Sequence, residues 1–327
     1  MAEMLKLITG TLAGNISLII LSFILLYYGA DLLVKGSVSL ALSFGVQKLI
    51  IGLTLVAFGT SMPEFMVSLM AAIQKSTGMA VGNVIGSNIF NIAFILGIAS
   101  LIRPLQIQKS IIRMEIPILF CCTLLFNLLV LDGVLGFWDG IILLLIFFGY
   151  IVFRLIYEKR QKTQQDNGEI TEIKGSRAKN LFIAILGIGI LVLGSEFLIR
   201  GGIFVARHFQ VSELVIGFTI LAAGTSLPEL FTSVVASIKK EADISVGNVI
   251  GSNFFNIFFV LGLLAVISSL QIDKTVVRLD NWVHLGLTIA LFPIMKSGLR
   301  INRFEGAFLL IFYVIYCLNL FFKWVTV

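Results

Sequence analysis

The sequence is poor in charge. Only 13% of its 327 residues are Asp, Glu, Lys or Arg, whereas 58% are hydrophobic. A soluble domain carries about a quarter charged residues, so this composition excludes an ordinary soluble protein. Apolar stretches of about 18 residues or more, each long enough to cross a bilayer as a helix, recur from one end to the other. The sequence therefore predicts an all-α integral membrane protein that contacts the lipid bilayer.

Residues for soft-metal binding or catalysis are also scarce. The 3 cysteines lie in apolar runs without metal-ligand spacing, and His208 and His284 stand alone. No Ser-His, Asp-pair or His-Glu-x-x-His arrangement is visible. We therefore expect no enzyme activity and no cofactor. The first residues lack the basic segment and cleavage site of a signal peptide, so we expect the first span to be retained.

Basic residues exceed acidic ones, and the formal net charge is +6. A basic balance can indicate nucleic-acid binding, but here the Lys and Arg residues lie in loops that alternate with apolar spans. This distribution is typical of the charge bias that orients membrane proteins. We expect no nucleic-acid partner.

The hydropathy pattern predicts ten membrane spans. One long polar segment, residues 158–178, divides them into two sets of five. The expected organisation is a first five-helix repeat over 1–157, a flexible cytoplasmic linker over 158–178 and a second five-helix repeat over 179–327. The predicted spans are 14–42, 47–73, 80–101, 112–131, 137–157, 179–206, 212–238, 244–269, 280–297 and 304–323.

The two sets repeat each other in sequence. Gly52–Gly97 aligns without a gap on Gly217–Gly262, at an offset of 165 (229 − 64), and 26 of the 46 aligned positions are identical. Each copy has an odd number of predicted spans, so the second copy must enter the membrane in the opposite direction, as in inverted-repeat transporters. With the linker inside, inside loops and their flanks hold 16 Lys and Arg against 6 outside. This imbalance predicts that both termini lie outside.

Each copy carries one acid in the middle of its second span. Glu64 ends the sequence Gly-Thr-Ser-Met-Pro-Glu, and Glu229 ends Gly-Thr-Ser-Leu-Pro-Glu. A carboxylate at bilayer depth costs roughly 3 kcal/mol or more unless something cationic neutralises it. Two such acids in matched surroundings predict a site that holds cations.

A proline precedes each of these acids. Pro63 and Pro228 cannot donate a backbone N–H, so the second and seventh helices should break or kink there. Carbonyls freed around 57–60 and 222–225 then need partners, because hydrocarbon offers none. A cation can be that partner.

A second duplicated motif, Gly-Asn-Val-Ile-Gly-Ser-Asn-x-Phe-Asn, follows in the third and eighth spans. It places Ser87 and Asn91 four residues apart, and likewise Ser252 and Asn256, so each pair shares one helix face. Taken alone, such a run of small and polar residues is also typical of close helix packing. Together with the two carboxylates it offers only hard oxygen donors, which suit Ca²⁺ or Na⁺.

These two duplicated motifs resemble the alpha-repeats of the cation/Ca²⁺ exchanger superfamily, the sodium/calcium exchangers and their prokaryotic relatives. The resemblance covers essentially the whole chain. It implies that Glu64 and Glu229 hold Ca²⁺ and share in Na⁺ binding. It further implies carbonyl ligands at the helix breaks, from Ala57, Thr60, Ala222 and Thr225. Side-chain ligands for Na⁺ would come from Ser61, Ser226, Ser87 and Ser252. Two amides, Asn91 and Asn256, would complete the site.

The resemblance implies secondary antiport of Na⁺ for Ca²⁺, by alternating access at one midplane site, in the plasma membrane of a prokaryote. One chain contains both halves of the site, so a monomer should suffice. Some K⁺-dependent relatives carry Asp where this chain has Asn256, so K⁺ co-transport is not expected. Proton-driven exchange is an alternative, because proton-driven relatives share the same glutamates. A cation channel is another, although channels usually build their charged rings across subunits.

Overall fold

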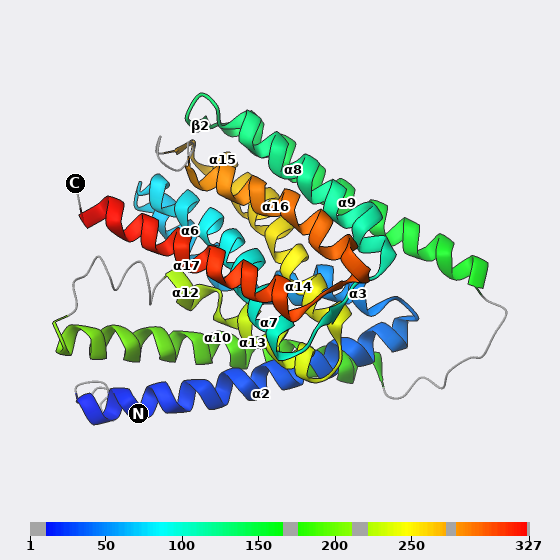
Figure 1. Ribbon diagram of the computed structural model, residues 1–327, viewed down its shortest axis with the longest axis horizontal. Coiled ribbons are helices and arrows are strands. Elements are labelled where there is room, and N and C mark those ends of the chain that lie inside the picture. The colour runs from blue at the N-terminus through cyan, green and yellow to red at the C-terminus, as the bar shows by residue number, and fades with distance from the viewer. Residues whose placement is uncertain (1–10, 166–175, 211–221, 273–278, 326–327) are drawn as a thin grey trace.

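The computed structural model describes residues 11–165, 176–210, 222–272 and 279–325. Long helices cross one another in a bundle, and the start of α2 and the end of α17 lie on the same side of it in Figure 1. The helices and strands of the first half are α2 (Leu12–Phe44), α3 (Lys48–Ile51), η1 (Gly52–Val56), α4 (Ala57–Thr60), α5 (Met62–Ile73), α6 (Thr77–Ile89), η2 (Phe90–Ile95), α7 (Leu96–Ile102), β1 (Leu105–Gln106), η3 (Ile111–Glu115), α8 (Ile116–Leu129), β2 (Val134–Leu135) and α9 (Phe137–Gln165).

The second half follows the same order wherever the structure describes it. Its elements are α10 (Arg177–His208), α12 (Ala222–Thr225), α13 (Leu227–Ile238), α14 (Ala242–Phe254), η5 (Phe255–Leu261), α15 (Gly262–Ile267), β3 (Leu270–Gln271), α16 (Asn281–Lys296), η7 (Ser297–Leu299), β4 (Arg300–Ile301) and α17 (Arg303–Val325). The segments η1, η2, η3 and η5 are π-helical, a local widening that is frequent at functional sites.

Within the described residues, 8 helices are long and apolar enough to cross a membrane, and the bent pair Lys48–Thr60 and Met62–Ile73 would make a ninth. These match nine of the predicted spans to within a few residues. The remaining predicted span, 212–238, lies partly outside the described residues, and α13 is its described apolar part. The structure therefore confirms a helical membrane protein.

The first residues of the predicted linker are helical. Helix α9 continues through 158–165 and ends at Gln165, and α10 begins at Arg177. Glu, Lys, Arg and Gln are good helix formers, and no Gly or Pro interrupts residues 158–165, so the helix extends beyond its apolar part. The prediction of a flexible segment beginning at residue 158 was wrong for these residues.

Helices α2 and α10, which occupy the same place in the two sequence copies, pack side by side and antiparallel (Figure 1). Gly36 lies against Ala184, and Gly187 lies so close to Leu33 that a Cβ on it would be 2.5 Å from the Leu33 backbone nitrogen. Small residues thus allow the two backbones to approach, as in membrane helix pairs generally. The pair shares a smaller hydrophobic cluster that is separate from the main core.

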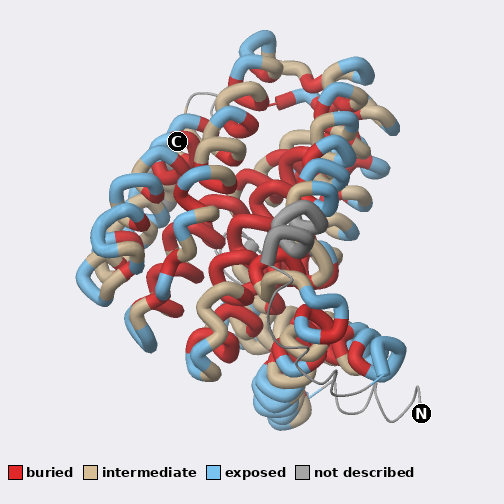
Figure 2. The backbone as a smooth tube through the Cα atoms, turned by 90° about the vertical axis from the view of Figure 1, so that its right-hand side faces the viewer, coloured by how far each residue is buried: buried red, intermediate tan, exposed pale blue. Residues whose placement is uncertain are grey.

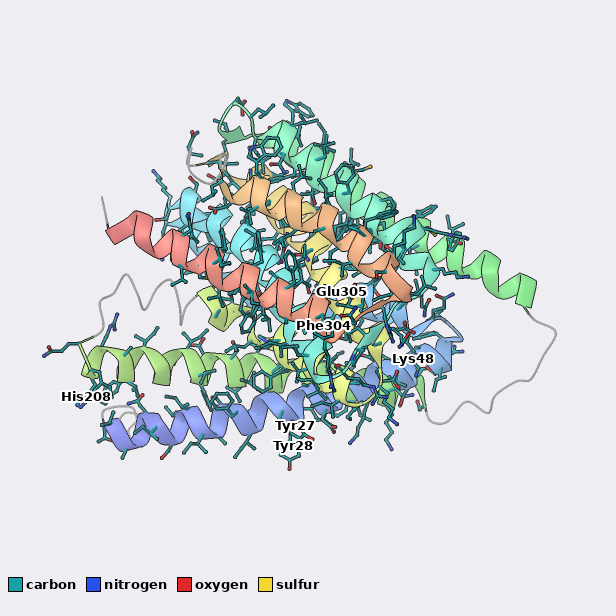
Figure 3. The ribbon with its side chains drawn as sticks, viewed as in Figure 1. Tyr27, Tyr28, Lys48, His208, Phe304 and Glu305 are labelled. Carbon is teal, nitrogen blue, oxygen red and sulfur yellow. The ribbon has the colours of Figure 1, made fainter. Side chains whose placement is uncertain are left out.

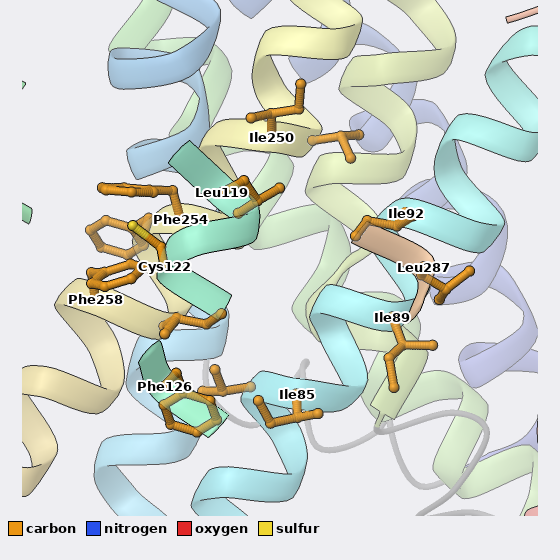
Figure 4. Packing of buried hydrophobic residues seen from close by; sticks show 14 of the residues in the cluster. Ile85, Ile89, Ile92, Leu119, Cys122, Phe126, Ile250, Phe254, Phe258 and Leu287 are labelled. Atoms are coloured by element: carbon orange, nitrogen blue, oxygen red, sulfur yellow. The ribbon is translucent and has the colours of Figure 1, made fainter. Parts of the chain in front are cut away.

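Burial is concentrated in the middle of the bundle, and the outer faces of the peripheral helices are exposed (Figure 2). Large apolar side chains point outward, among them Tyr27 and Tyr28 of α2 (Figure 3), as expected for helices that face lipid. The main core lies between α6, α8, η5 and α16, where Leu119, Cys122 and Phe126 of α8 pack near Phe254 and Phe258 (Figure 4).

Two short antiparallel ladders tie the halves together. Strand β1 pairs with β4, with Leu105 opposite Ile301, and β2 pairs with β3, with Leu135 opposite Leu270. Each ladder therefore joins one strand from each half. Because β1 and β3 are equivalent in the sequence repeat (105 + 165 = 270), the two ladders are equivalent to each other.

Candidate functional site

Both copies of the Gly-Thr-Ser-x-Pro-Glu motif form a helix break at their serine. Ser61 and Ser226 separate α4 from α5 and α12 from α13, and their backbone angles are nearly identical (φ −84°, ψ 6° and φ −87°, ψ 9°). Pro63 and Pro228 lie in the first turn of the following helix, where a missing N–H costs nothing. The first break bends its helix pair by 43°. Both predicted breaks are thus present; residues 211–221, before α12, lie outside the described residues.

The break places each acid in the first turn of a new helix. Glu64 opens α5 and Glu229 opens α13, and both are fully buried. The positive end of a helix dipole favours a carboxylate at this position. Local chain geometry therefore offsets part of the cost of placing an acid in the interior.

The two acids are held by serines from the opposite halves. The Ser61 hydroxyl donates to Oε1 of Glu229 at 2.7 Å, and the Ser226 hydroxyl donates to Oε1 of Glu64, also at 2.7 Å. Each broken helix thus binds the carboxylate of the other. This crossed pairing brings both acids into one buried cluster of polar side chains.

Serines from α6 and α14 belong to the same buried cluster. Ser87 Oγ lies 3.1 Å from Ser226 Oγ and also contacts the Glu64 carboxylate. The Ser252 hydroxyl donates to Glu229 Oε1 at 3.4 Å. Both serines are buried, so the structure brings the duplicated serines next to the duplicated glutamates.

The threonines of the motif are buried beside them. Thr60 Oγ1 lies 3.0 Å from Asn248 Oδ1, a contact that crosses between the halves, and the Thr60 side chain also reaches Glu229. Thr225 is buried at the equivalent position in α12, where Ala222 is the first residue.

The structure corrects the prediction about freed carbonyls at Ala57. Its carbonyl oxygen accepts the Ser61 N–H at 3.0 Å, so the break does not free it. The proline at position 63 instead removes the N–H that would serve Gly59, four residues earlier. In the second half the corresponding carbonyl, on Gly224, accepts the Ser195 hydroxyl of α10 at 2.5 Å.

Ser195 was missed by the sequence reasoning. Its position in the first copy (195 − 165 = 30) is Ala30, which has no hydroxyl. The Ala-to-Ser difference between otherwise matched segments was the available signal for this contact with the Gly224 carbonyl.

The asparagines of the second motif divide into two roles. Asn256 donates to Asn88 Oδ1 at 3.0 Å, and Asn88 donates to the Asn253 carbonyl at 3.2 Å. Asn91 is also fully buried, but neither of its side-chain polar atoms has a partner among the described residues. The two predicted amides therefore differ at their nitrogens, whereas the side-chain oxygen of each has no hydrogen-bond partner among the described residues.

Asn83 and Asn248, at the start of the motif, hydrogen-bond to the backbone of the two acids. Asn83 donates to the Glu64 carbonyl at 3.3 Å and to Ser68 at 3.0 Å. Asn248 makes the same two bonds, to the Glu229 carbonyl at 3.3 Å and to Ser233 at 3.1 Å. The duplication of both Asn and Ser in the sequence could have identified this support.

The buried cluster of acids, serines and amides offers oxygen ligands to a hard cation. Oε2 of Glu64 and Oε2 of Glu229 are buried and have no hydrogen-bond partner among the described residues. Buried polar atoms are normally satisfied, so two orphaned carboxylate oxygens indicate a ligand that fills the space beside them. Carboxylate, hydroxyl and amide oxygens suit Ca²⁺ or Na⁺. No cluster of three or more His, Cys, Asp or Glu occurs in the described part of the chain, so neutral oxygens would have to complete any coordination shell.

A helical membrane bundle in which two buried acids lie among hydroxyl and amide oxygens is typical of a membrane protein that handles cations. The chain belongs to the sodium/calcium exchanger protein family, whose family model matches residues 14–156 and 179–322.

Individual relatives agree with this family. The chain is 38% identical to the inner membrane protein YrbG of Escherichia coli, over 84% of this chain and 86% of that protein. It is 30% identical to the sodium/calcium exchanger MaX1 of Methanosarcina acetivorans, over 94% and 99%. A structure of the sodium-calcium exchanger NCX_Mj, soaked with Na⁺ and Sr²⁺, superposes with a TM-score of 0.80 at 31% identity, covering 93% of this chain and 98% of that one.

Proposed function

We propose that the protein is a secondary antiporter that exchanges Na⁺ for Ca²⁺ across the membrane. The observation that carries this proposal is the crossed pairing of Ser61 with Glu229 and of Ser226 with Glu64, which brings two acids together in one buried cluster. Membership of the sodium/calcium exchanger family and the sodium/calcium exchange named for MaX1 and NCX_Mj support it.

Both ions would use this one pocket. We propose Glu64 and Glu229 as the charged ligands, with neutral oxygens around them from Thr60, Thr225, Ser61, Ser226, Ser87, Ser252, Asn91, Asn256, Ala57 and Ala222. The Ala57 oxygen accepts the Ser61 N–H at 3.0 Å and, at the longer distance of 3.4 Å, the Thr60 hydroxyl, so a bound cation would take the place of that hydroxyl.

Charge balance explains why the ions would compete. Two carboxylates are neutralised by one Ca²⁺ or by at least two Na⁺, so occupancy by one ion type disfavours the other. An empty pocket would leave two uncompensated acids in the interior, which is strongly unfavourable. Crossing without cargo is therefore disfavoured, and the site couples the two ion movements.

The membrane arrangement that we propose has ten spans in two inverted five-helix repeats, with both termini outside, in the plasma membrane of a prokaryote. Two findings support inversion. The equivalent helices α2 and α10 run antiparallel, and the equivalent ladders β1–β4 and β3–β2 each join one strand from each half. The start of α2 and the end of α17 also lie on the same side of the bundle (Figure 1). Both halves of the pocket come from one chain, so we propose that a monomer transports.

The test is Ca²⁺ uptake into proteoliposomes that contain the purified protein and an outward Na⁺ gradient. Wild-type protein should take up Ca²⁺ only while the gradient lasts. Glu64→Gln and Glu229→Gln should each abolish uptake, whereas Asp132→Asn, at an exposed turn, should retain it. Uptake that persists in either glutamine variant would contradict the proposed site.

The same vesicles distinguish the alternative driving ion. With a pH gradient in place of the Na⁺ gradient, we expect no Ca²⁺ uptake. Uptake driven by protons alone would show a proton-coupled exchanger, and uptake with neither gradient would indicate a channel.

A further inference from the structure

A pocket of about 420 Å³ lies at one end of the bundle, between the π-helical start of α8 and the end of α16. It is lined by Lys109, Arg113 and Lys296 together with apolar side chains. Its volume is within the range of small-molecule sites. Because these residues come from α16 and η7 and from η3, α8 and the turn before them, the pocket is distinct from the acidic site formed by α5, α6, α13 and α14.

Three cations converge on this pocket without an acidic partner. Lys109, Arg113 and Lys296 are all exposed, and none of them forms an ion pair with a described residue. The Lys296 ammonium lies 5.5 Å from the centre of the Phe292 ring, an arrangement that favours the charged amine at the rim. A pocket of this charge repels Ca²⁺ and Na⁺, so it is no part of a cation pathway, and it attracts an anion.

The remaining walls are apolar: Ile112, Pro117, Phe292 and Leu299. A small inorganic anion would leave these walls without a partner. A lipid has both parts, an anionic phosphodiester and hydrocarbon chains. Basic pockets between transmembrane helices on the cytoplasmic side are suited to such headgroups.

The backbone around the pocket is held in place by both halves. The Ile107 N–H donates to the Leu299 carbonyl at 2.9 Å, next to the β1–β4 ladder. The tight turn at Gly298 and Leu299, both with positive φ (71° and 53°), directs the chain from α16 into β4. A headgroup bound here would therefore bridge the first half to the second.

We propose that this pocket binds an anionic phospholipid, with its phosphate between Lys109, Arg113 and Lys296 and its chains along Phe292 and Pro117. In the sequence repeat, the counterparts of the three cations are Lys274, Arg278 and Leu131 (296 − 165 = 131), so the second copy of the pattern lacks one cation. The proposal goes beyond ion exchange and shares with it only the membrane placement of the chain.

The test is native mass spectrometry of the purified full-length protein titrated with phosphatidylglycerol or phosphatidylcholine. Three basic side chains near a membrane surface predict that Lys109→Gln/Arg113→Gln/Lys296→Gln weakens phosphatidylglycerol binding by about 100-fold. Phosphatidylcholine binding should not change. The matched control, Arg103→Gln/Arg303→Gln, removes two exposed basic residues that do not line the pocket and should stay within about twofold of wild type.

A single substitution, Lys296→Leu, introduces the residue found at the equivalent position of the first half and keeps an apolar stem. It should weaken phosphatidylglycerol binding by about fivefold at an unchanged unfolding temperature. This variant tests the proposal even if the triple variant fails to fold.

A third experiment distinguishes binding of a whole lipid from binding of any phosphate anion. Inorganic phosphate at millimolar concentration should not displace phosphatidylglycerol from the wild-type protein. Displacement by phosphate would show an anion site without lipid specificity. Equal phosphatidylglycerol binding by Lys296→Leu and wild type would overturn the proposal that this pocket binds the lipid. Either result would leave Na⁺-driven Ca²⁺ uptake, and hence the proposed function, unaffected.

Discussion

The two halves of the molecule share a frame but not every contact. Around the acids they match closely, because Ser61 and Ser226 bind the opposite glutamates at the same distance, and Asn83 and Asn248 make the same bonds. Away from the acids they differ. The halves are thus nearly symmetric where the proposed ions bind and asymmetric where the surrounding helices are held.

Three differences stand out. The carbonyl freed by Pro228 accepts the Ser195 hydroxyl, whereas the first half has Ala30 at that position. Asn256 is hydrogen-bonded and Asn91 is not, among the described residues. The buried charged cluster of Glu115, Arg154 and Tyr150 has no equivalent salt bridge among the described residues of the second half, where the counterparts of the ion pair are Asp280 and Asn319 and Asp280 accepts the Tyr316 hydroxyl. Gene duplication therefore preserved the site and let its supports diverge.

The largest expected effect lies in that charged cluster. Arg154 Nη1 lies 3.1 Å from Glu115 Oε1, both side chains are almost completely buried, and Tyr150 donates to the same carboxylate. Arg154→Met leaves an unpaired buried acid and should lower the free energy of unfolding by about 3–5 kcal/mol. Thermal unfolding in detergent measures the loss. Adding Glu115→Gln should restore most of it, and a double variant as unstable as the single one would contradict this account.

The next effect tests the symmetry at the acids. Ser61→Ala and Ser226→Ala each remove a hydrogen bond to a buried carboxylate, which is worth about 1.5–3 kcal/mol. If these serines hold the ligands in place, both variants should weaken Ca²⁺ binding by about 10- to 100-fold, and by similar factors. Isothermal titration with Ca²⁺ measures both. A large effect in one variant and none in the other would show that the crossed pairs are not equivalent in function.

The smallest effect tests an asymmetric support. Ser195→Ala leaves the Gly224 carbonyl without its hydroxyl partner and should cost about 1–3 kcal/mol of stability. Ser43→Ala is the matched control, because the Ser43 hydroxyl donates at 3.0 Å to the Leu40 carbonyl within its own helix. The unfolding temperature should fall clearly in the first variant and little in the second. Equal losses would mean that the Ser195 contact has no special role.

Much of the fold could be predicted because it depends on local rules. Hydropathy located the spans, since a helix that faces lipid must be apolar over its length. Proline located the breaks at Ser61 and Ser226, since the missing N–H acts within one turn. The end of α9 was misjudged because polar residues such as Glu158 and Lys159 can form helix as well as linker.

The candidate site was predictable in composition but not in connectivity. Duplication identified Glu64, Glu229, Ser87 and Ser252, and the structure places them together. The sequence contained no sign that Ser61 would bind Glu229 rather than Glu64, or that Asn91 and Asn256 would differ.

The sequence by itself determined a charge-poor helical membrane protein with two matched, proline-broken acidic motifs, because propensity, hydropathy and repetition act along the chain. Only the tertiary structure decided which hydroxyl meets which carboxylate, which freed carbonyl is satisfied and where three basic side chains gather. Those outcomes depend on how helices from opposite halves cross, and residues more than a hundred positions apart meet only after the bundle has packed.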